Sequence, residues 1–413
     1  MTFKIEDPNR TRVDTVVIGG GPAGCTAATL LAQEGQKVVL LERSTKPTFK
    51  IGESLIPGTY WTLERLGMIE KLKQSHFQKK HSVQFYSSSG RGSAPFYFYD
   101  NDPHESSVTW QVLRSEFDQM LLDHAAESGV IVKRGVSARK VLFEGNRASG
   151  VEAKFPGGTI RQIQSNVVVD ATGQSTLISR KGALKESDSR LKNAAIFTHF
   201  RGATRDQGQD EGATLVMHTD DKSAWFWYIP LADDLVSVGV VGPIDTLLED
   251  KRKGLQYIFD NQVEKCLPLK GRIQSAEQVF AAKATKDFSY RSSQVAGDGW
   301  VLVGDALGFL DPVYSSGVLL AFQSGEMAAD CIIDAWKNND FSEKRLSAFQ
   351  DKFWRGMDAF KKLVYAFYNK DFSFARFLKK YPQCKQGVTD ILSGNIFKPS
   401  VEQIFEPLDQ MLS

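Results

Sequence analysis

The sequence predicts an α/β fold in which a parallel-sheet domain is interleaved with a domain of antiparallel strands and followed by a helical region. Within residues 13–43, a β-branched run, a glycine-rich turn, a helical pattern and a second apolar run follow one another, which is typical of a strand–turn–helix–strand unit. Residues 82–100 and 194–287 hold alternating and aromatic segments that indicate antiparallel strands. Beyond about residue 340 the pattern is helical and rich in aromatic side chains.

Composition and charge exclude several classes of protein. The chain has 413 residues and a net charge of +2, so no basic field favours binding to nucleic acid. Its four cysteines form no C-x-x-C pair and its six histidines show no ligand spacing, which argues against disulfides and a metal site. The first residues lack the apolar core of a signal peptide, and no clean run of about 20 apolar residues could cross a membrane. We therefore expect a cytoplasmic protein with no metal and no membrane partner.

The first motif is the glycine-rich turn after the strand predicted at residues 13–18. Gly19, Gly21 and Gly24 stand in G-x-G-x-x-G register, and Glu42 ends the next strand about 20 residues further on. Such glycines permit a tight turn and let a pyrophosphate approach the N–H groups at the start of a helix. The motif predicts a dinucleotide site, and valine at Gly21 or Gly24 should leave the fold intact but remove the cofactor. The alternative is a glycine-rich turn without a ligand.

Two further strand–turn segments have the same character. Residues 165–173 read as a buried strand that ends in a turn, and residues 301–317 read as a strand, a turn and a loop before a long helix. Asp305 at the second strand end can bond a sugar-like hydroxyl, and the helix that begins after Gly317 would face a second anionic or electron-rich group. Another helix is predicted to start near Arg114.

Together these three motifs resemble the FAD-dependent monooxygenases of the p-hydroxybenzoate hydroxylase fold, over about residues 13–340. The resemblance implies FAD rather than NAD, because the third segment of that fold meets the ribityl chain. It also implies that Arg114 is a flavin-contacting arginine; the alternative is a surface salt bridge. The fold class is then an FAD-binding Rossmann-like domain interleaved with an antiparallel β-sheet substrate domain, plus a C-terminal helical region. The expected boundaries are 1–78, 107–187 and 288–340 for the FAD-binding domain, 79–106 and 188–287 for the substrate domain, and 341–413 for the helical region.

A tryptophan-rich segment narrows the resemblance. Trp225, Trp227, Ile229 and Pro230 stand as W-x-W-x-I-P, which resembles the signature of flavin-dependent halogenases. Period-two spacing puts the first three side chains on one face of a strand, and Pro230 would end the strand or mark a sheet edge. In that family the strand lies beside the flavin, and its bulk is thought to keep the substrate away from it. The alternative is an aromatic face packed into a core.

Two loops resemble the same family. Residues 49–57 are similar to its G-E-S loop, and residues 311–318 are similar to its flavin and halide loop. The resemblance implies halide binding at Ser316 and Gly317, where backbone N–H groups at a helix start would stabilise a small anion. A helix N-cap by Ser315 or Ser316 is the alternative, and both roles are compatible.

The family's catalytic lysine has two candidates. In residues 76–85, Lys80 precedes Phe85 by the five places seen in the family, whereas the period-two argument favours Lys79, which shares its parity with Phe85. A desolvated amine there could position or capture the halogenating species. The alternative is a pair of solvated lysines.

The resemblance implies an FADH2-dependent halogenase that oxidises halide through a flavin C4a-hydroperoxide and halogenates an electron-rich aromatic substrate, phenol- or pyrrole-like, free or carrier-tethered. Free tryptophan is disfavoured, because Tyr314 stands where tryptophan halogenases carry a glutamate. The cofactors and co-substrates are FAD, O2 and chloride or bromide. A flavin reductase is the expected partner, because the sequence has no second dinucleotide fingerprint.

The alternatives are an FAD-dependent aromatic hydroxylase, a geranylgeranyl-reductase-like flavoprotein of the same fold, and a non-catalytic flavin-binding protein. Lys80 is the expected catalytic residue, and Trp225, Trp227, Ile229 and Pro230 are the expected barrier. The residues expected to bind the cofactor are Gly19, Gly21, Pro22, Ala23, Gly24, Glu42, Arg43, Ser54, Arg114, Asp305, Pro312, Gly317 and Val318.

Overall fold

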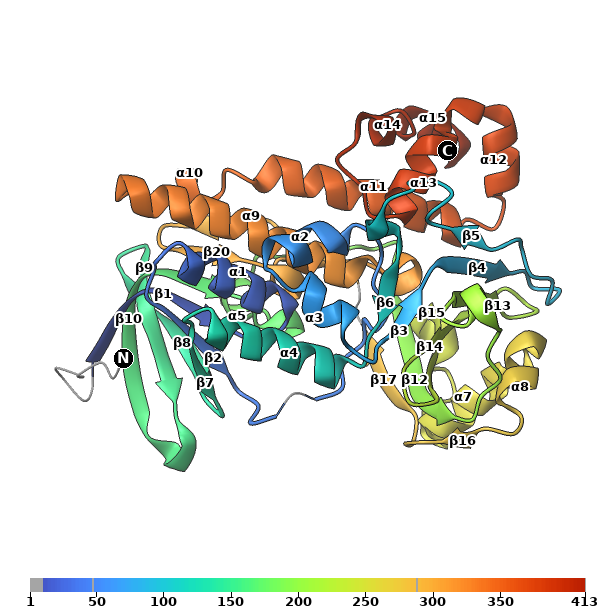
Figure 1. The fold of residues 1–413 in the computed structure, drawn as a ribbon, viewed down its shortest axis with the longest axis horizontal. Helices are drawn as coiled ribbons and strands as arrows, with labels where there is room; N and C mark the ends of the chain where they lie inside the picture. The colour runs from blue at the N-terminus through green and yellow to red at the C-terminus, as the bar shows by residue number, and fades with distance from the viewer. Residues whose placement is uncertain (1–9, 47, 287–288, 413) are drawn as a thin grey trace.

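The computed structural model describes residues 10–46, 48–286 and 289–412. Two large sheets lie at opposite ends of an elongated molecule, and long helices run between them (Figure 1). None of the helices in these ranges combines the length and the apolar character needed to cross a membrane. Within the same ranges no cluster of histidine, cysteine, aspartate or glutamate is arranged to hold a metal ion.

The first sheet has the order β19-β20-β10-β1-β2-β7, and β8 and β9 extend it beside β10. All pairs from β20 to β7 are parallel. Parallel strands covered on both faces are nearly continuously apolar, as the fully buried run at residues 167–169 shows. The strands are β1 (Arg10–Ile18), β2 (Val38–Glu42), β7 (Ile131–Arg134), β8 (Ser137–Glu144), β9 (Arg147–Lys154), β10 (Ile160–Asp170), β19 (Ala296–Gly297) and β20 (Trp300–Leu302).

Helix α1 (Pro22–Gln33) follows the first strand and packs against α9 (Ser316–Asn338) and α4 (Arg114–Glu127). Helix α4 begins at Arg114, as predicted. Close approach of α1 and α9 depends on Gly325, where an added Cβ would lie 2.6 Å from the carbonyl oxygen of Ala23. Smaller elements around them are α2 (Thr59–Arg65), α3 (Ile69–Lys73), α5 (Leu177–Lys181), β3 (Gln78–Lys80), β6 (Thr109–Gln111), β11 (Lys185–Ser187), β18 (Tyr290–Ser292) and β21 (Gly308–Phe309).

The second sheet has the order β16-β12-β15-β14-β13-β4-β5, and β17 also pairs with β12. Its two faces serve two separate cores: Trp225, Trp227 and Ile229 pack into the main core of the protein, whereas Phe226 and Tyr228 pack into a second one. The predicted period-two arrangement is therefore confirmed. The strands are β4 (Ser82–Tyr86), β5 (Phe96–Tyr97), β12 (Asn193–Arg201), β13 (Thr214–His218), β14 (Trp225–Pro230), β15 (Leu235–Pro243), β16 (Glu277–Gln278) and β17 (Lys283–Lys286).

Pro230 is the last residue of β14, so the prediction that it would end the strand or mark an edge is confirmed in its first form; β14 itself lies between β13 and β15. Two details of this region differ from the prediction. Strand β4 pairs with β13 in parallel, so the sheet is not purely antiparallel. Residues 244–273, within the region predicted to hold antiparallel strands, form the helices α6 (Ile244–Leu247), α7 (Leu255–Glu264) and α8 (Leu267–Ile273).

The physical reason for the helix α7 is its apolar spacing. Ile258, Phe259 and Val263 recur at helical intervals and are buried in the second core.

The strands of the two sheets alternate along the chain, as expected for interleaved domains. The exact domain boundaries stay a prediction.

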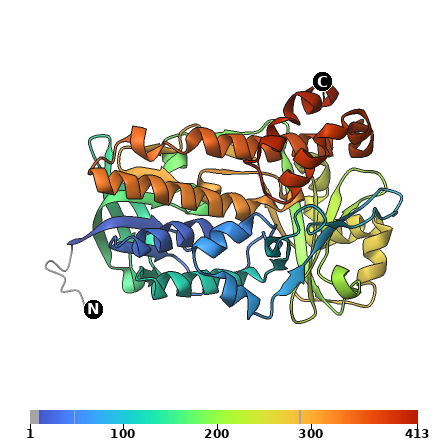
Figure 2. The same cartoon turned by 45° about the horizontal axis from the view of Figure 1, so that its top comes forward.

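The C-terminal region is helical, as predicted. Figure 2 shows α9 and α11 (Gln350–Tyr368) side by side, with the last helices at the end that carries the second sheet. Helix α11 also contacts the loop around residues 312–314. The remaining helices are α10 (Glu343–Leu346), α12 (Phe374–Lys380), α13 (Lys385–Leu392), α14 (Pro399–Glu402) and α15 (Phe405–Leu412).

Candidate active site

The three motifs meet at the carboxyl ends of neighbouring parallel strands β1, β10 and β20. Gly19 has a φ of +109°, and an added Cβ there would lie 2.2 Å from the carbonyl oxygen of Ala171 in the second turn. Gly304 in the third turn has a φ of +59°, and its Cβ would lie 2.8 Å from the Cβ of Ala23. Both contacts leave no room for a side chain. The fold thus brings segments more than a hundred residues apart into direct contact.

The glycines of the first turn have different tasks. A Cβ on Gly24 would lie 2.0 Å from the carbonyl oxygen of Gly19, whereas a Cβ on Gly21 meets only the Nζ of Lys50, at 4.0 Å. Gly24 therefore permits helix α1 to pack against its own turn, and only Gly21 borders open space. The expectation that Gly24→Val leaves the fold intact is wrong, because that side chain would overlap backbone. Pro22 and Ala23 are the first two residues of α1.

At the end of β2, Glu42 is half-buried, and its carboxylate accepts hydrogen bonds from the backbone N–H of Gly20 and of Ser44, both at 2.8 Å. It therefore braces the glycine turn. Its neighbour Arg43 is exposed.

Arg114 is buried, so the alternative of a surface salt bridge is wrong. Its guanidinium donates to both carboxylate oxygens of Asp118, at 2.8 and 3.1 Å, and to the carbonyl oxygen of Ile51, at 2.8 Å. A charge that is buried in this way needs a partner, which Asp118 provides. Burial raises the pKa of the nearby Asp305 carboxyl to about 6, against the lowering influence of Arg114.

These residues fit a bound FAD. The N-cap residue of α1 is Gly21, which has no side chain to accept a hydrogen bond from the first N–H groups of the helix. These N–H groups are therefore free to bind an anion at the open side of the turn. The half-buried Asp305 carboxylate accepts no hydrogen bond from the part of the chain that the structure describes. A pyrophosphate at the first position and a sugar-like hydroxyl at the second would satisfy both groups.

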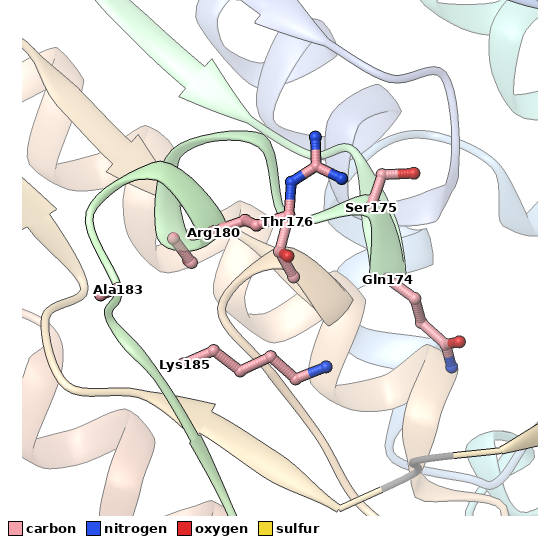
Figure 3. A pocket seen from close by; sticks show the side chains of 7 residues that line it. Gln174, Ser175, Thr176, Arg180, Ala183 and Lys185 are labelled. Carbon is pink, nitrogen blue, oxygen red and sulfur yellow. The ribbon is translucent and has the colours of Figure 1, made fainter.

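A separate open pocket of about 430 Å³ lies beside the second turn (Figure 3). The basic side chains Arg180 and Lys185 belong to its lining. None of the residues predicted for the site lines it.

Lys80 is one of the most buried large side chains of the protein, with 1% of its surface exposed. Its Nζ donates to the Oγ of Ser54 at 2.8 Å and to the carbonyl oxygen of Leu55 at 3.0 Å. Burial lowers the pKa of Lys80 to about 7. Lys79 is exposed. The period-two argument in its favour is wrong, because Lys80 and Ser82 are the buried residues here, whereas Phe85, which shares the parity of Lys79, is only half-buried.

Ser54, predicted to bind the cofactor, lies against this lysine. Its hydroxyl is 2.9 Å from the hydroxyl of Thr214, which also accepts from the Nε2 of Gln111 at 2.8 Å. These four side chains come from the loop after β2, from β3, from β6 and from β13. No motif marked Thr214 or Gln111 in the sequence, because only the pairing of distant strands brings them together.

A second buried pair was also missed. Glu53, next to Ser54, lies 3.1 Å from the Nε2 of His199 on β12, and both side chains are buried. The ring of Phe49 packs edge-on against His199 at 5.1 Å. The G-E-S loop is thus fixed to the second sheet by a polar contact as well as by an aromatic one.

The candidate halide loop leads into helix α9. Ser315 occupies the N-cap position with a left-handed φ of 55° and makes no side-chain cap hydrogen bond, so the alternative of a side-chain cap is wrong for Ser315. Ser316, the first residue of the helix, is buried. Pro312 opens the short 3-10 helix η7 (Pro312–Tyr314), and Val318 lies against Gly52. The loop and the G-E-S segment are therefore neighbours.

Trp225 and Trp227 form a continuous wall with Ile229, which we call the tryptophan wall. The two indole centroids are 6.4 Å apart, and Trp227 stacks on Phe197 at 6.3 Å. The indole N–H of Trp227 donates to the Oγ of Ser237 at 3.1 Å. Trp227 lies across β15 because Gly239 has no side chain there.

Comparison with known proteins agrees with this geometry. The tryptophan halogenase family matches residues 14–101 and 99–386. The chain belongs to this family of flavin-dependent halogenases, so the prediction of a halogenase that uses FAD is confirmed.

Among its relatives is a 1H-pyrrole-2-carbonyl-[peptidyl-carrier protein] chlorinase of Pseudomonas fluorescens, 29% identical over 97% of this chain and 93% of that protein. The corresponding brominase of Pseudoalteromonas luteoviolacea is 34% identical over 79% of each. The structure of the flavin-dependent brominase Bmp2 superposes with a TM-score of 0.86 at 30% identity, covering 97% of this chain and all of the other. A geranylgeranyl bacteriochlorophyll reductase-like protein of Thermoplasma acidophilum, at 18% identity and a TM-score of 0.73, shares the fold alone while covering 98% and 99% of the two chains.

We expect Gly21→Val to lower FAD affinity about tenfold or more, because its side chain would enter the only open side of the turn. Gly271→Val is the matched control, since a Cβ there meets no atom within 4 Å. Flavin absorbance after equilibrium dialysis would measure binding. Equal FAD affinity of both variants would contradict the assignment.

Gly239→Ala should displace the Trp227 ring, because the new Cβ would lie 2.2 Å from it. Overpacking of this kind destabilises by about 1–3 kcal/mol. Gly242→Ala on the same strand, with 3.2 Å to its nearest neighbour, should be milder. Urea unfolding of both variants tests this, and a smaller loss for Gly239→Ala would show that the wall is not packed on β15.

The lowered pKa of Lys80 implies a pH-dependent stability. Between about pH 7 and pH 10 the folded chain holds a neutral amine and the unfolded chain an ammonium, so the free energy of unfolding should rise with pH by up to about 1.4 kcal/mol per pH unit. Below pH 7 both states are protonated and this contribution is constant. Urea unfolding from pH 6 to 9 should show the rise in Lys79→Met but not in Lys80→Met; parallel curves would refute it.

Proposed function

We propose that the protein is an FADH2-dependent halogenase that places chlorine or bromine on an electron-rich aromatic ring, pyrrole- or phenol-like, free or tethered to a carrier protein. The flavin, with dioxygen, supplies the oxidising equivalent that turns halide into an electrophilic halogen. Overall, reduced FAD, dioxygen, halide, a proton and an aromatic C–H give FAD, the aryl halide and two waters. A flavin reductase would supply the reduced cofactor. The four cysteines are unpaired, which suits a cytoplasmic protein.

One observation carries this proposal: the tryptophan wall has the candidate halide loop at one end and the buried lysine at the other. Trp225 begins β14 and connects through Tyr368 to Asp311, the residue before Pro312. Toward the other end of β14, Tyr228 pairs with Leu215 of β13. Thr214, which precedes Leu215, is hydrogen-bonded to Ser54, and Ser54 accepts a hydrogen bond from Lys80. Bulky rings between two chemical sites would keep an aromatic substrate from the flavin while a small oxidant passes.

Each site has a fitting chemistry in this proposal. Ser316 and Gly317 begin the long helix α9, whose first N–H groups suit a halide. Lys80, with a pKa near 7, can act at neutral pH as a donor or as an amine toward an electrophilic halogen. Tyr314 is buried and donates to the carbonyl oxygen of Leu363 at 3.2 Å, so it offers no base. An activated ring needs none, because it reacts directly with electrophilic halogen.

The substrate class is supported by the relatives. Two of them are named for pyrrole-2-carbonyl groups on a carrier protein, and one solved structure is a brominase. Free pyrrole-2-carboxylate, phenol and the carrier-bound pyrrole are therefore the substrates to compare, each with chloride and with bromide.

Lys80→Met should lower the rate of ring halogenation by at least about a hundredfold, the range expected when an acid–base or nucleophilic group is lost. Oxidised halogen trapped by a scavenger should still form, because the lysine lies at the substrate end. Lys79→Met, on the exposed face of the same strand, is the control. The assay uses FAD, a flavin reductase, NADH and halide, with products identified by mass spectrometry. Loss of activity in Lys79→Met but not in Lys80→Met would reverse the assignment.

A further inference from the structure

A hydrogen-bonded chain joins the tryptophan wall to the candidate halide loop through the C-terminal helix α11. The indole N–H of Trp225 donates to the hydroxyl oxygen of Tyr368 at 2.8 Å. The same hydroxyl donates to the Oδ2 of Asp311 at 2.8 Å. Tyr368 is the last residue of α11, so three segments distant in sequence meet at one phenol.

The direction of this chain is fixed by the groups at its ends. An indole N–H only donates, and an ionised carboxylate only accepts. The group between Trp225 and Asp311 must therefore accept from one and donate to the other. A tyrosine hydroxyl does both, whereas a phenylalanine at this position would leave the Trp225 indole N–H without its acceptor and remove one donor from Asp311.

Asp311 holds several elements at once. Its Oδ2 also accepts from the Nδ2 of Asn193 on β12 at 2.8 Å, and its Oδ1 accepts from the backbone N–H of Val313 at 3.2 Å. The side chain is 1% exposed. A buried carboxylate is stable only when donors surround it, and here the donors come from the loop, the second sheet and α11.

Helix α11 contacts both the tryptophan wall and the same loop at further points. Its Phe367 ring lies edge-on to Trp225 at 5.8 Å and to Tyr314 at 6.2 Å. The Tyr314 hydroxyl donates to the carbonyl oxygen of Leu363, which lies about one turn before Phe367 in the helix. The tryptophan wall and the loop therefore both pack against the same face of α11.

The loop needs such support because its backbone is strained. Ser315 has a φ of 55°, which an L side chain rarely adopts, and it stands immediately before Ser316 and Gly317. Strained residues of this kind persist only where the surroundings fix them. The N–H groups that follow can bind an anion only while this backbone conformation is held.

We propose that Tyr368 is a positioning residue: it locks Trp225 and the loop 311–317 together and thereby sets the affinity of the protein for halide. This inference rests on the proposed function, because it takes the loop to be the halide site. Tyr368 acts through Asp311 and Trp225 rather than on the halide itself.

Tyr368→Phe is the test, because it keeps the ring and removes both hydrogen bonds. Bromide titration of the FAD-loaded protein, followed by flavin absorbance, gives the halide Kd, and FAD affinity is measured separately. We expect a bromide Kd about five- to tenfold weaker, which corresponds to the loss of one ordinary hydrogen bond, with FAD affinity changed less than about twofold.

Tyr365→Phe is the matched control. Tyr365 lies on the same helix and also donates to a carboxylate, that of Asp188. Asp188 takes no part in the hydrogen bonds that join Trp225, Tyr368 and Asp311. Both bromide and FAD affinity should stay as in the wild type. A general loosening of α11 would instead weaken bromide binding in both variants, and this outcome would overturn the specific role of Tyr368.

Trp225→Phe supplies an independent measurement of the contact. If Tyr368 joins wall and loop, the effects of Trp225→Phe and Tyr368→Phe on the free energy of unfolding are non-additive in the double variant. Additive effects would overturn the proposal. If the wild-type protein binds FAD but no bromide, both the proposed halide site and the role of Tyr368 are wrong. If the wild type binds bromide and Tyr368→Phe binds it equally well, only the role of Tyr368 is wrong.

Discussion

The close contact between the turns after β1 and β10 is the constraint on which the rest of the structure depends. Gly19 and Ala171 approach so closely that no side chain fits between them. Because the parallel register of β1 and β10 brings both turns to the same edge, the third turn can pack on Ala23 through Gly304. The open face of the glycine turn, the carboxylate of Asp305 and the start of α9 then lie along one border of the sheet, where ligands of open α/β sheets bind.

Desolvation is the second physical theme. Within the part of the chain that the structure describes, Lys80 has no carboxylate partner; its Nζ donates to a hydroxyl and to a carbonyl oxygen. Burial without a counter-charge favours the neutral amine, which is why its pKa falls. Arg114 shows the opposite solution, since its equally buried charge is matched by Asp118. The protein thus keeps one cation charged and makes another one titratable.

The tryptophan wall shows how one strand serves two cores. Alternate side chains of β14 enter opposite faces of the sheet, so Trp225 and Trp227 pack into the main core of the protein while Phe226 and Tyr228 pack into the second core. The wall cannot relax independently, because β14 is bonded on both edges and Trp227 fills the space left by Gly239. A central strand that is bonded on both edges therefore holds these side chains in place.

The sequence by itself determined the motifs that are local. The glycine turn after β1, the start of α4 at Arg114, the one-face pattern of β14 and the helical C-terminal region all depend on residues near in sequence, whose periodicity and backbone preferences are visible in the chain. The tertiary structure alone decided the contacts between distant segments. It showed Thr214 and Gln111 around Ser54, Tyr368 between Trp225 and Asp311, and the burial that separates Lys80 from Lys79. Strand parity failed for the lysines because Phe85, which shares the parity of Lys79, is only half-buried, whereas Lys80 and Ser82 are buried, and α7 was missed within a region of strands. Burial and hydrogen bonding depend on what packs against a side chain, and that neighbour is rarely its neighbour in sequence.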